Sequence, residues 1–300
     1  MATKHGGIKR LLFATDFSTC ARHAAEYAAL LGSAYGASVD VIHVSELYPG
    51  VYAGVQDYRE TDGMLADTVQ CLQRSMLPVT GHQSTGIPSV QICAAAADWR
   101  ADVIVMGTHG RTGLEHILLG STAERVLITA PCPVLTVREV TRAAGKPAQV
   151  PISFEHIAIP IDFSECSVNA FEFGIHVAKT FEASVTLLHV LEPLSYGDDL
   201  TLRQAMEEGG VDERIDARLG SYVSRSESAG VVAQRVIRGG MPADSILDFV
   251  RASACDLIVM GTHGRRGISR LLRGSVAETV LRLASCPVLA GKRFPRSFPS

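Results

Sequence analysis

The chain has 300 residues, 47% of them hydrophobic, and a formal net charge of −3. This length and apolar content suffice for about two domains with buried cores, and the near-neutral balance excludes a general electrostatic attraction to nucleic acid. No apolar run reaches the roughly 18 residues that span a membrane, and the first residues lack the apolar core of a signal peptide. We therefore expect a cytoplasmic protein that binds neither nucleic acid nor membrane, with its seven cysteines as reduced, mostly packed thiols.

The first half of the chain alternates short apolar runs with longer helical patterns. Nearly continuous apolar runs predict strands that are buried on both faces of a parallel sheet. Helical patterns cover 18–35, which opens with the capping residue Ser18, and 121–129. A segment at 78–86 has two glycines and little apolar content, so we expect a strand there only by analogy with 233–239. The predicted strands are 8–15, 38–44, 78–86, 102–107 and 132–137.

The second half repeats this succession. Residues 11–44 return at 157–190, and 16 of 24 positions are identical between 104–127 and 258–281. A duplicated strand and helix succession of this kind predicts an α/β fold with two copies of one parallel sheet. The repeated strands are expected at 156–161, 184–190, 233–239, 256–261 and 286–290, and the repeated helices at 164–181 and 275–284. The expected domains are 1–145 and 146–300, the second including a short basic tail at 291–300.

A glycine pattern, Gly-x-x-Gly-x9-Gly-Ser, follows the fourth strand of each half. In the first half it runs from Gly107, where the strand ends, to Gly120 and Ser121, where a helix begins. Open α/β sheets bind ligands at this carboxyl edge, glycines allow close backbone approach, and a helix N-terminus attracts anions. Neither a Walker A sequence nor the dinucleotide fingerprint accompanies the pattern. The spacing therefore predicts a phosphate cradle, present twice.

These residues resemble the universal stress protein family in its tandem two-domain form. The resemblance rests on the Gly-x-x-Gly-x9-Gly-Ser pattern, the aspartate that follows the first strand of each half, and the Cys-Pro-Val-Leu that opens the last. It implies that each domain is an open five-stranded parallel sheet of order 3-2-1-4-5 flanked by helices. It also implies ATP binding, because this glycine pattern marks the family members that resemble ATP binders.

The resemblance assigns a role to particular positions. It implies that Asp16 and Asp162 meet the ribose or nearby polar groups, and that Val44 and Val190 contact adenine through the backbone. The phosphates would be held by Gly107, Gly110, Gly120 and Ser121 in the first half, and by Gly261, Gly264, Gly274 and Ser275 in the second.

Several of these positions have an alternative role that the sequence leaves open. Asp16 and Asp162 are also placed to cap the following helix. Arg111 and Arg265, which follow the loop glycines, are either phosphate contacts or solvated surface charges.

Four histidines also lie near the predicted cradles. His109 and His263, inside the loops, either contact a phosphate or order the loop. His43 and His189 precede the strand-end valines and are expected to be packed core histidines.

The leading functional hypothesis is an ATP-binding stress-response module in which nucleotide occupancy of the two cradles is the signal. Magnesium would accompany the ATP, held through water by Asp16 or Asp162. The motif supplies a cradle without a catalytic constellation, so we expect slow hydrolysis at most. The alternative is a structural or chaperone-like module on the same fold that binds no nucleotide, and a remoter one is a flavin or related cofactor.

The last strand of each half predicts an association. Strands 132–137 and 286–290 are apolar edge strands, which usually need cover. We expect the two halves to cover one another as an intrachain pseudo-dimer, with further homodimerisation and an unidentified protein partner. Two differences, Ala14 against Pro160 and Thr112 against Arg266, predict nucleotide sites of unequal affinity.

Overall fold

The computed structural model describes residues 7–46, 55–108, 119–138, 152–192, 210–262 and 275–294. The elements of the first half are β1 (Arg10–Ala14), α1 (Thr19–Tyr35), β2 (Ser38–Ser45), α2 (Val55–Gln73), β3 (Val79–Thr85), α3 (Pro88–Asp98), β4 (Val103–Gly107), α4 (Ser121–Thr129) and β5 (Val134–Val137). Those of the second half are β6 (His156–Pro160), α5 (Glu165–Phe181), β7 (Ser184–Leu191), α7 (Gly210–Ser228), β8 (Ala233–Gly239), α8 (Pro242–Ala252), β9 (Leu257–Gly261), α9 (Ser275–Leu283) and β10 (Val288–Gly291).

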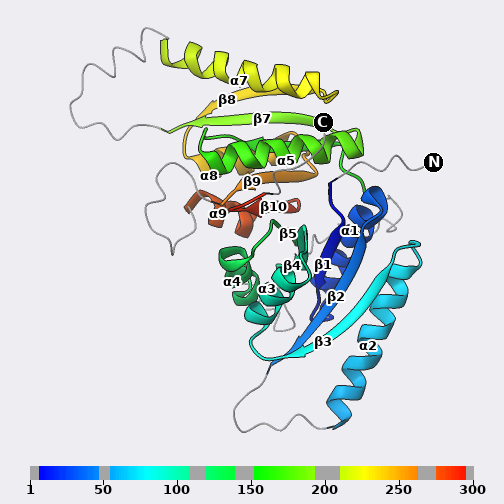
Figure 1. Ribbon diagram of the computed structural model, residues 1–300. Coiled ribbons are helices and arrows are strands. Elements are labelled where there is room, and N and C mark those ends of the chain that lie inside the picture. The colour runs from blue at the N-terminus through cyan, green and yellow to red at the C-terminus, as the bar shows by residue number, and fades with distance from the viewer. Residues whose placement is uncertain are drawn as a thin grey trace, which may run out of the picture.

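The ten strands of the described residues form one continuous sheet in which the two halves meet edge to edge (Figure 1). The order is β3-β2-β1-β4-β5-β10-β9-β6-β7-β8, so each half has the order 3-2-1-4-5. Pairs within a half are parallel, whereas β5 and β10 pair antiparallel, with Leu135 opposite Leu289. The predicted fold class is confirmed. The antiparallel pair covers two edges that would otherwise be exposed.

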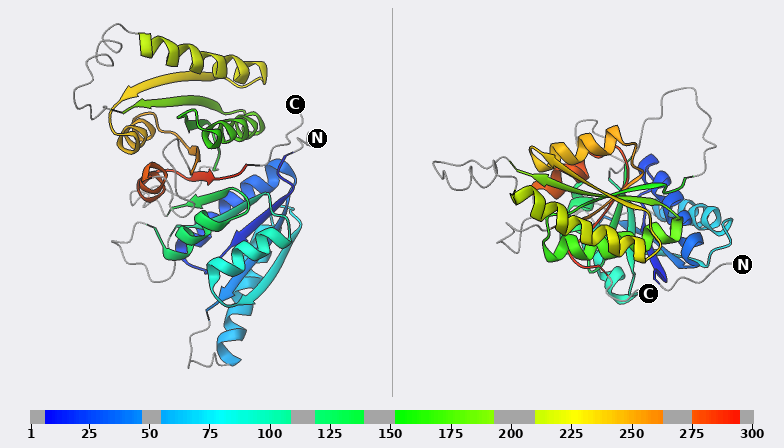
Figure 2. Two further views of the ribbon diagram at one scale, coloured as in Figure 1. Left: turned by 60° about the vertical axis from the view of Figure 1, so that its left-hand side comes forward. Right: turned by 90° about the horizontal axis from the view of Figure 1, so that it is seen from above.

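Helices cover both faces of the sheet. Leu11 and Phe13 belong to a buried cluster to which α1, α2, α5 and α7 contribute. Leu12 and Ala14 belong to a second cluster, to which α3, α4, α8 and α9 contribute. Successive strand residues thus alternate between two buried faces, which is why the inner strands are almost continuously apolar. The outer strands β3 and β8, with α2 and α7, lie at opposite ends of the molecule (Figures 1 and 2).

The first of these clusters continues across the junction between the halves. Tyr27 of α1 stacks on Phe154 with ring centroids 5.9 Å apart, and Phe154 contacts Phe181 of α5 edge-on at 5.0 Å. Phe154 is buried, with 1% of its surface exposed. The halves therefore share aromatic core in addition to the β5–β10 pair. The predicted boundary between residues 145 and 146 lies outside the described residues.

The weakest predicted strand is confirmed as β3. It pairs in parallel with β2 along its whole length. Its glycine is explained by helix packing, because a Cβ on Gly81 would lie 2.9 Å from Cγ2 of Val69 in α2. As the outermost strand of its half, β3 has one sheet neighbour and several exposed side chains, so it needs little apolar content.

The helices that begin with serine caps are confirmed. The hydroxyls of Ser18 and Ser164 accept hydrogen bonds from N–H groups in the first turns of α1 and α5. The sequence patterns did not predict α2, α3, α7 or α8. A signal was present for two of them, since α3 and α8 begin at Pro88 and Pro242, and proline is favoured at the first helical position. Among the described residues, no helix is long and apolar enough to cross a membrane.

Candidate functional site

The carboxyl ends of the central strands bring together three of the predicted site residues of each half. In the first half, Ala14 at the end of β1 is in register with Ile42 of β2 and Met106 of β4. Asp16, Val44 and Gly107 follow these positions within two residues, so they lie at one edge of the sheet. The repeated strands β6, β7 and β9 pair in the same order and bring Asp162, Val190 and Gly261 to the corresponding edge.

A backbone hydrogen bond closes the glycine-rich connection of the first half. The N–H of Gly120 donates to the carbonyl of Thr108 at 2.7 Å. The chain that leaves the end of β4 therefore returns to it at the start of α4, and Ser121 begins that helix beside the strand end. The predicted residues Gly110, Arg111, Gly264, Arg265 and Gly274 lie outside the described residues, as do His109, His263, Thr112 and Arg266.

The start of α4 has the backbone geometry of an anion site. Gly120 is the N-cap residue, in extended conformation with φ −67° and ψ 146°, and provides no capping side chain. The first N–H groups of a helix have no intrahelical acceptor, and the helix dipole makes this end electropositive. Glu124 lies in the same first turn, as Glu278 does in α9, and its charge opposes a bound anion. In α9 the ion pair between Glu278 and Arg282, 3.8 Å apart, moderates that opposition.

Gly107 and Gly261 are required by the protein's own packing. A Cβ on Gly107 would lie 3.0 Å from Sγ of Cys20 and 3.1 Å from the backbone N of Ala21, both in α1. A Cβ on Gly261 would lie 2.7 Å from Sγ of Cys166 and 2.9 Å from its carbonyl carbon, in α5. Both glycines therefore let a helix start pass close over a strand end. This role is independent of any ligand.

Asp16 and Asp162 each cap a turn between a strand and a helix. Oδ1 of Asp16 accepts a hydrogen bond from the N–H of Ser18 at 3.1 Å. Oδ1 of Asp162 accepts from the N–H and the hydroxyl of Ser164, at 3.0 and 2.6 Å. The N-cap residues of α1 and α5 are Ser18 and Ser164, so the aspartates hold the turn before each helix and do not cap the helix itself. A carboxylate has about four acceptor sites, so the turn is compatible with a ligand contact.

The prediction that His43 and His189 are packed core histidines is confirmed, since they are 6% and 8% exposed. Val44 and Val190, one residue further on, are half-buried against the opposite cluster. The sequence did not reveal the partners of these histidines, Phe17 and Phe163, whose ring centroids lie 4.4 and 4.9 Å from those of the imidazoles. The available signal was that both copies repeat Asp-Phe-Ser and His-Val at matching places.

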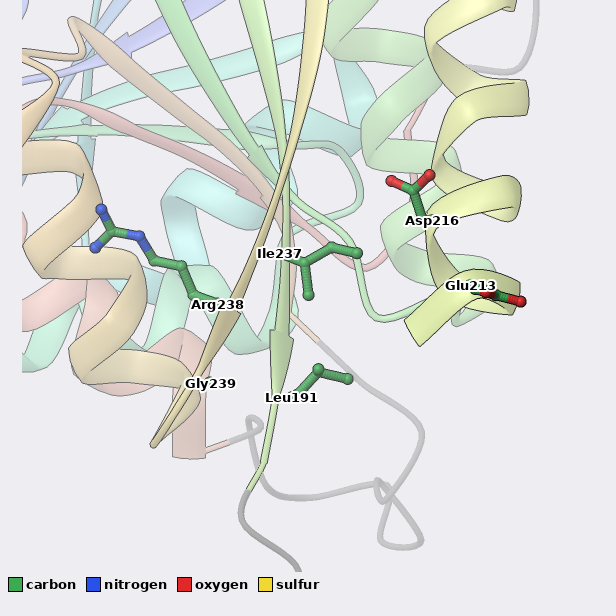
Figure 3. Close-up of a pocket in the computed structure, with 6 residues that line it drawn as sticks. All are labelled: Leu191, Glu213, Asp216, Ile237, Arg238 and Gly239. Atoms are coloured by element: carbon green, nitrogen blue, oxygen red, sulfur yellow. The ribbon is translucent and has the colours of Figure 1, made fainter. Parts of the chain in front are cut away.

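A shallow groove of about 520 Å³ lies between α7 and the carboxyl ends of β7 and β8 (Figure 3). Asp216 on its α7 side is bound by both Nε and Nη2 of Arg235, at 2.5 and 2.8 Å. This hydrogen bonding holds the pKa of the Asp216 carboxyl below its ordinary value. The side chain of Arg238 turns toward α8, where its guanidinium lies 5.1 Å from the ring of Phe249. The lining residues are Leu191, Glu213, Asp216, Ile237, Arg238 and Gly239, none of which the sequence singled out.

The donor set fits magnesium only if a phosphate supplies most of the ligands. Among the described residues, no group of three or more His, Cys, Asp or Glu side chains could hold a metal ion. Magnesium commonly binds through one or two carboxylates together with water and substrate phosphates. Within the described part of each edge, one aspartate, Asp16 or Asp162, is consistent with that mode and not with an all-protein metal site.

Comparison with known proteins identifies the family. The model of the universal stress protein family matches residues 7–138 and 153–292, so the chain belongs to this family, with two tandem copies of its domain. The universal stress protein MJ0531 of Methanocaldococcus jannaschii is 35% identical over 147 residues, covering 47% of this chain and 83% of that protein. The tandem arrangement also has a counterpart, because Rv2623 of Mycobacterium tuberculosis is 26% identical over 255 residues, covering 82% of this chain and 80% of that protein.

A solved structure supports the fold over the whole chain. The crystal structure of a universal stress protein from Archaeoglobus fulgidus superposes with a TM-score of 0.73 at 23% identity. The match covers 95% of this chain and 98% of the other. The duplicated sheet is therefore an arrangement found in another member of the family.

Proposed function

We propose that the protein is a nucleotide-binding stress-response module that takes up ATP at the carboxyl edge of each half. The observation that carries the proposal is the hydrogen bond from Gly120 to Thr108. It brings an uncapped helix N-terminus to the end of β4, and Asp16 follows β1, the strand that pairs with β4. An anion-binding helix start beside a carboxylate that can accept from ribose hydroxyls suits a nucleoside phosphate.

The residues of the first half divide among the parts of the nucleotide. The phosphates would bind at the start of α4, where Gly120 allows close backbone approach and the N–H of Ser121 would donate, with Gly110 and Arg111 of the loop assigned to the same role. Asp16 would accept from the ribose, and the backbone of Val44 would meet adenine. Magnesium would supply charge neutralisation at the phosphates and reach Asp16 through water. The second half repeats these roles with Asp162, Val190, Gly261, Gly264, Arg265, Gly274 and Ser275.

Occupancy, and not turnover, is the proposed signal. Phosphoryl transfer needs an oriented nucleophile and charge stabilisation as well as a cradle. Near the described part of the site, Asp16 follows β1 and holds the turn to Ser18, and Glu124 lies in the first turn of α4, so we assign neither carboxylate a catalytic role. Bound nucleotide would instead stabilise the folded chain, by about 2.7 kcal/mol when ATP is at 100 times its dissociation constant.

A structural or chaperone-like module is the second candidate, and a specific observation favours it. The family glycines Gly107 and Gly261 are explained by helix packing, and Asp16 and Asp162 by the turns that they cap. These four residues would be needed on this fold even without a nucleotide. The two candidates differ in whether the purified chain takes up ATP.

The test begins with the full chain. Protein purified under native conditions is denatured, the supernatant is chromatographed for adenine nucleotides, and the nucleotide-free chain is titrated calorimetrically with ATP and magnesium. We expect bound adenine nucleotide or two binding events. No nucleotide in the supernatant and no heat at millimolar ATP would overturn the proposal and favour the chaperone-like candidate.

Substitution of the aspartates tests the geometry. In Asp16→Asn the side chain keeps an oxygen for the N–H of Ser18 but loses the charge. Removing a hydrogen bond to a charged group costs about 1.5–3 kcal/mol, so we expect ATP affinity at one site to fall roughly 10- to 150-fold. The exposed Asp67 of α2 supplies the control, since Asp67→Asn removes an equal charge away from the site. Equal affinity in both variants would show that Asp16 does not contact the nucleotide.

A further inference from the structure

We infer that His43 and His189 are positioning residues for the two nucleotide sites, which they serve by locking the turns that present Asp16 and Asp162. The inference rests on the proposed function and deepens it, because it assigns a role at each site to a buried side chain that does not itself contact the ligand.

The first observation is where strand pairing stops. The N–H of Thr15 donates to the carbonyl of Ile42 at 3.0 Å, which continues the β1–β2 ladder one residue beyond β1. The carbonyl of Thr15 instead lies 2.9 Å from Nδ1 of His43. A carbonyl can only accept, so Nδ1 of His43 carries the proton and donates it. The side chain of a β2 residue thus takes the strand-end carbonyl, and the next residue, Asp16, begins the turn.

The second half repeats this arrangement with different neighbours. The N–H of Ile161 donates to the carbonyl of Leu188 at 2.8 Å, and the carbonyl of Ile161 accepts from Nδ1 of His189 at 2.6 Å. The residue that precedes the aspartate is threonine in one half and isoleucine in the other. The hydrogen bond from the histidine to the backbone carbonyl is therefore present in both halves, although the side chain of the residue that supplies this carbonyl differs between them.

The third observation is a strained residue directly after each aspartate. Phe17 has φ 65° and Phe163 has φ 63°, in the left-handed region that bulky residues rarely adopt. Each phenylalanine ring packs on the buried histidine of its half, with centroids 4.4 and 4.9 Å apart. Backbone in this region persists only when its surroundings hold it, and such residues concentrate at functional sites. One imidazole therefore fixes the turn on both sides of the aspartate, by a hydrogen bond before it and a ring contact after it.

Two variants separate the hydrogen bond from the ring contact. In His43→Phe an aromatic ring can still pack against Phe17, but the donor to Thr15 is lost. In His43→Asn the amide nitrogen can take the place of Nδ1, but the ring is lost. Each variant is made in the full chain, alone and combined with Asp16→Asn, and is titrated calorimetrically with ATP and magnesium. Thermal unfolding without nucleotide is measured in parallel, and the unaltered second site is the internal control.

The expected result is specific to the first site. His43→Phe weakens ATP binding there about 10-fold and leaves the second site unchanged, while His43→Asn recovers most of the affinity. When Asp16→Asn is already present, His43→Phe causes no further loss, because the histidine acts through the aspartate. The corresponding His189→Phe variant weakens the second site in the same way.

Three outcomes would overturn the inference. The first is unchanged ATP affinity in His43→Phe, and the second is a loss of the same size with and without Asp16→Asn, which would mark a purely structural role. The third applies if His43→Phe does not fold: a loss of ATP affinity in His43→Asn that is equally large in the His43→Asn, Asp16→Asn double variant would also overturn the inference. When Asp16→Asn weakens ATP binding and the histidine variants do not, this inference fails alone. When the wild-type chain takes up no ATP, the proposed function and the inference fail together.

Discussion

Replacing Gly261 by alanine should destabilise the folded chain. The added Cβ would lie 2.7 Å from Sγ of Cys166, 2.9 Å from its carbonyl carbon and 3.0 Å from its carbonyl oxygen. Two of these atoms are backbone of α5 and cannot rotate away, so α5 and the end of β9 must move apart. Overpacking of this kind costs about 1–3 kcal/mol, offset by the roughly 0.5–1 kcal/mol that alanine gains over glycine in regular structure. The expected net loss is about 1–2 kcal/mol.

The assay is urea unfolding of the full chain without nucleotide, monitored by circular dichroism. Gly107→Ala should cost less than Gly261→Ala, because its closest contacts are 3.0 and 3.1 Å. Gly63→Ala is the matched control: it lies in α2 with nothing within 4 Å of its Cβ, and should stabilise the chain by about 1 kcal/mol. If Gly261→Ala were as stable as the wild-type chain, the packing explanation for this glycine would be wrong.

Further predictions follow from the junction, the thiols and the groove. Phe154→Ala should lower the free energy of unfolding by about 3–5 kcal/mol, because the ring is buried between the halves. The control Met76→Ala, at a 92% exposed residue, should change that free energy by less than about 0.5 kcal/mol. Equal urea midpoints for the two variants would contradict this prediction. Burial, with the Asp102 charge, raises the pKa of Cys132 to about 12, so at pH 8 its thiol stays protonated. Mass spectrometry after brief iodoacetamide treatment should find Cys132 unmodified and the exposed Cys71 modified, whereas equal labelling would refute the burial argument. The Asp216 pKa is lowered by Arg235, so the pair's contribution to stability is present above the ordinary aspartate pKa and is lost as the pH falls through the lowered value. Arg235→Gln should raise the Asp216 pKa in an NMR titration, Arg251→Gln should leave it unchanged, and an unaltered pKa in both would exclude the assigned cause.

Much of the fold could be predicted from the sequence because its determinants are local. Apolar runs marked the inner strands, and Ser18 and Ser164 marked two helix starts, since capping depends on residues three positions apart. The outer strand β3 needed the analogy with β8, because one sheet neighbour demands little apolar content. Helices α2 and α7 were not predicted, because the many polar residues in them make their apolar pattern weaker than that of the inner strands.

The candidate site was predictable as a set of positions and not as a set of contacts. The glycine pattern and the repeated Asp-Phe-Ser indicated where a phosphate and a ribose would bind. The sequence did not show that Gly107 is needed for the approach of Cys20, 87 positions away, or that His43 takes the carbonyl of Thr15. Contacts between residues so far apart depend on how the strands and helices pack, which no local pattern encodes.

The sequence by itself determined the family, the duplication and the positions of the two glycine patterns, because residue identity and spacing carry that information. The apolar last strand of each half also predicted that the two halves cover one another, whereas only the tertiary structure decided that these strands pair antiparallel and which aromatic rings pack across the junction. The antiparallel pairing of β5 with β10 and the contact of Tyr27 with Phe154 bury apolar surface that either half alone would expose. The same packing decided that the turns bearing Asp16 and Asp162 are held by a buried histidine and a left-handed phenylalanine, since both contacts exist only once the strands lie side by side.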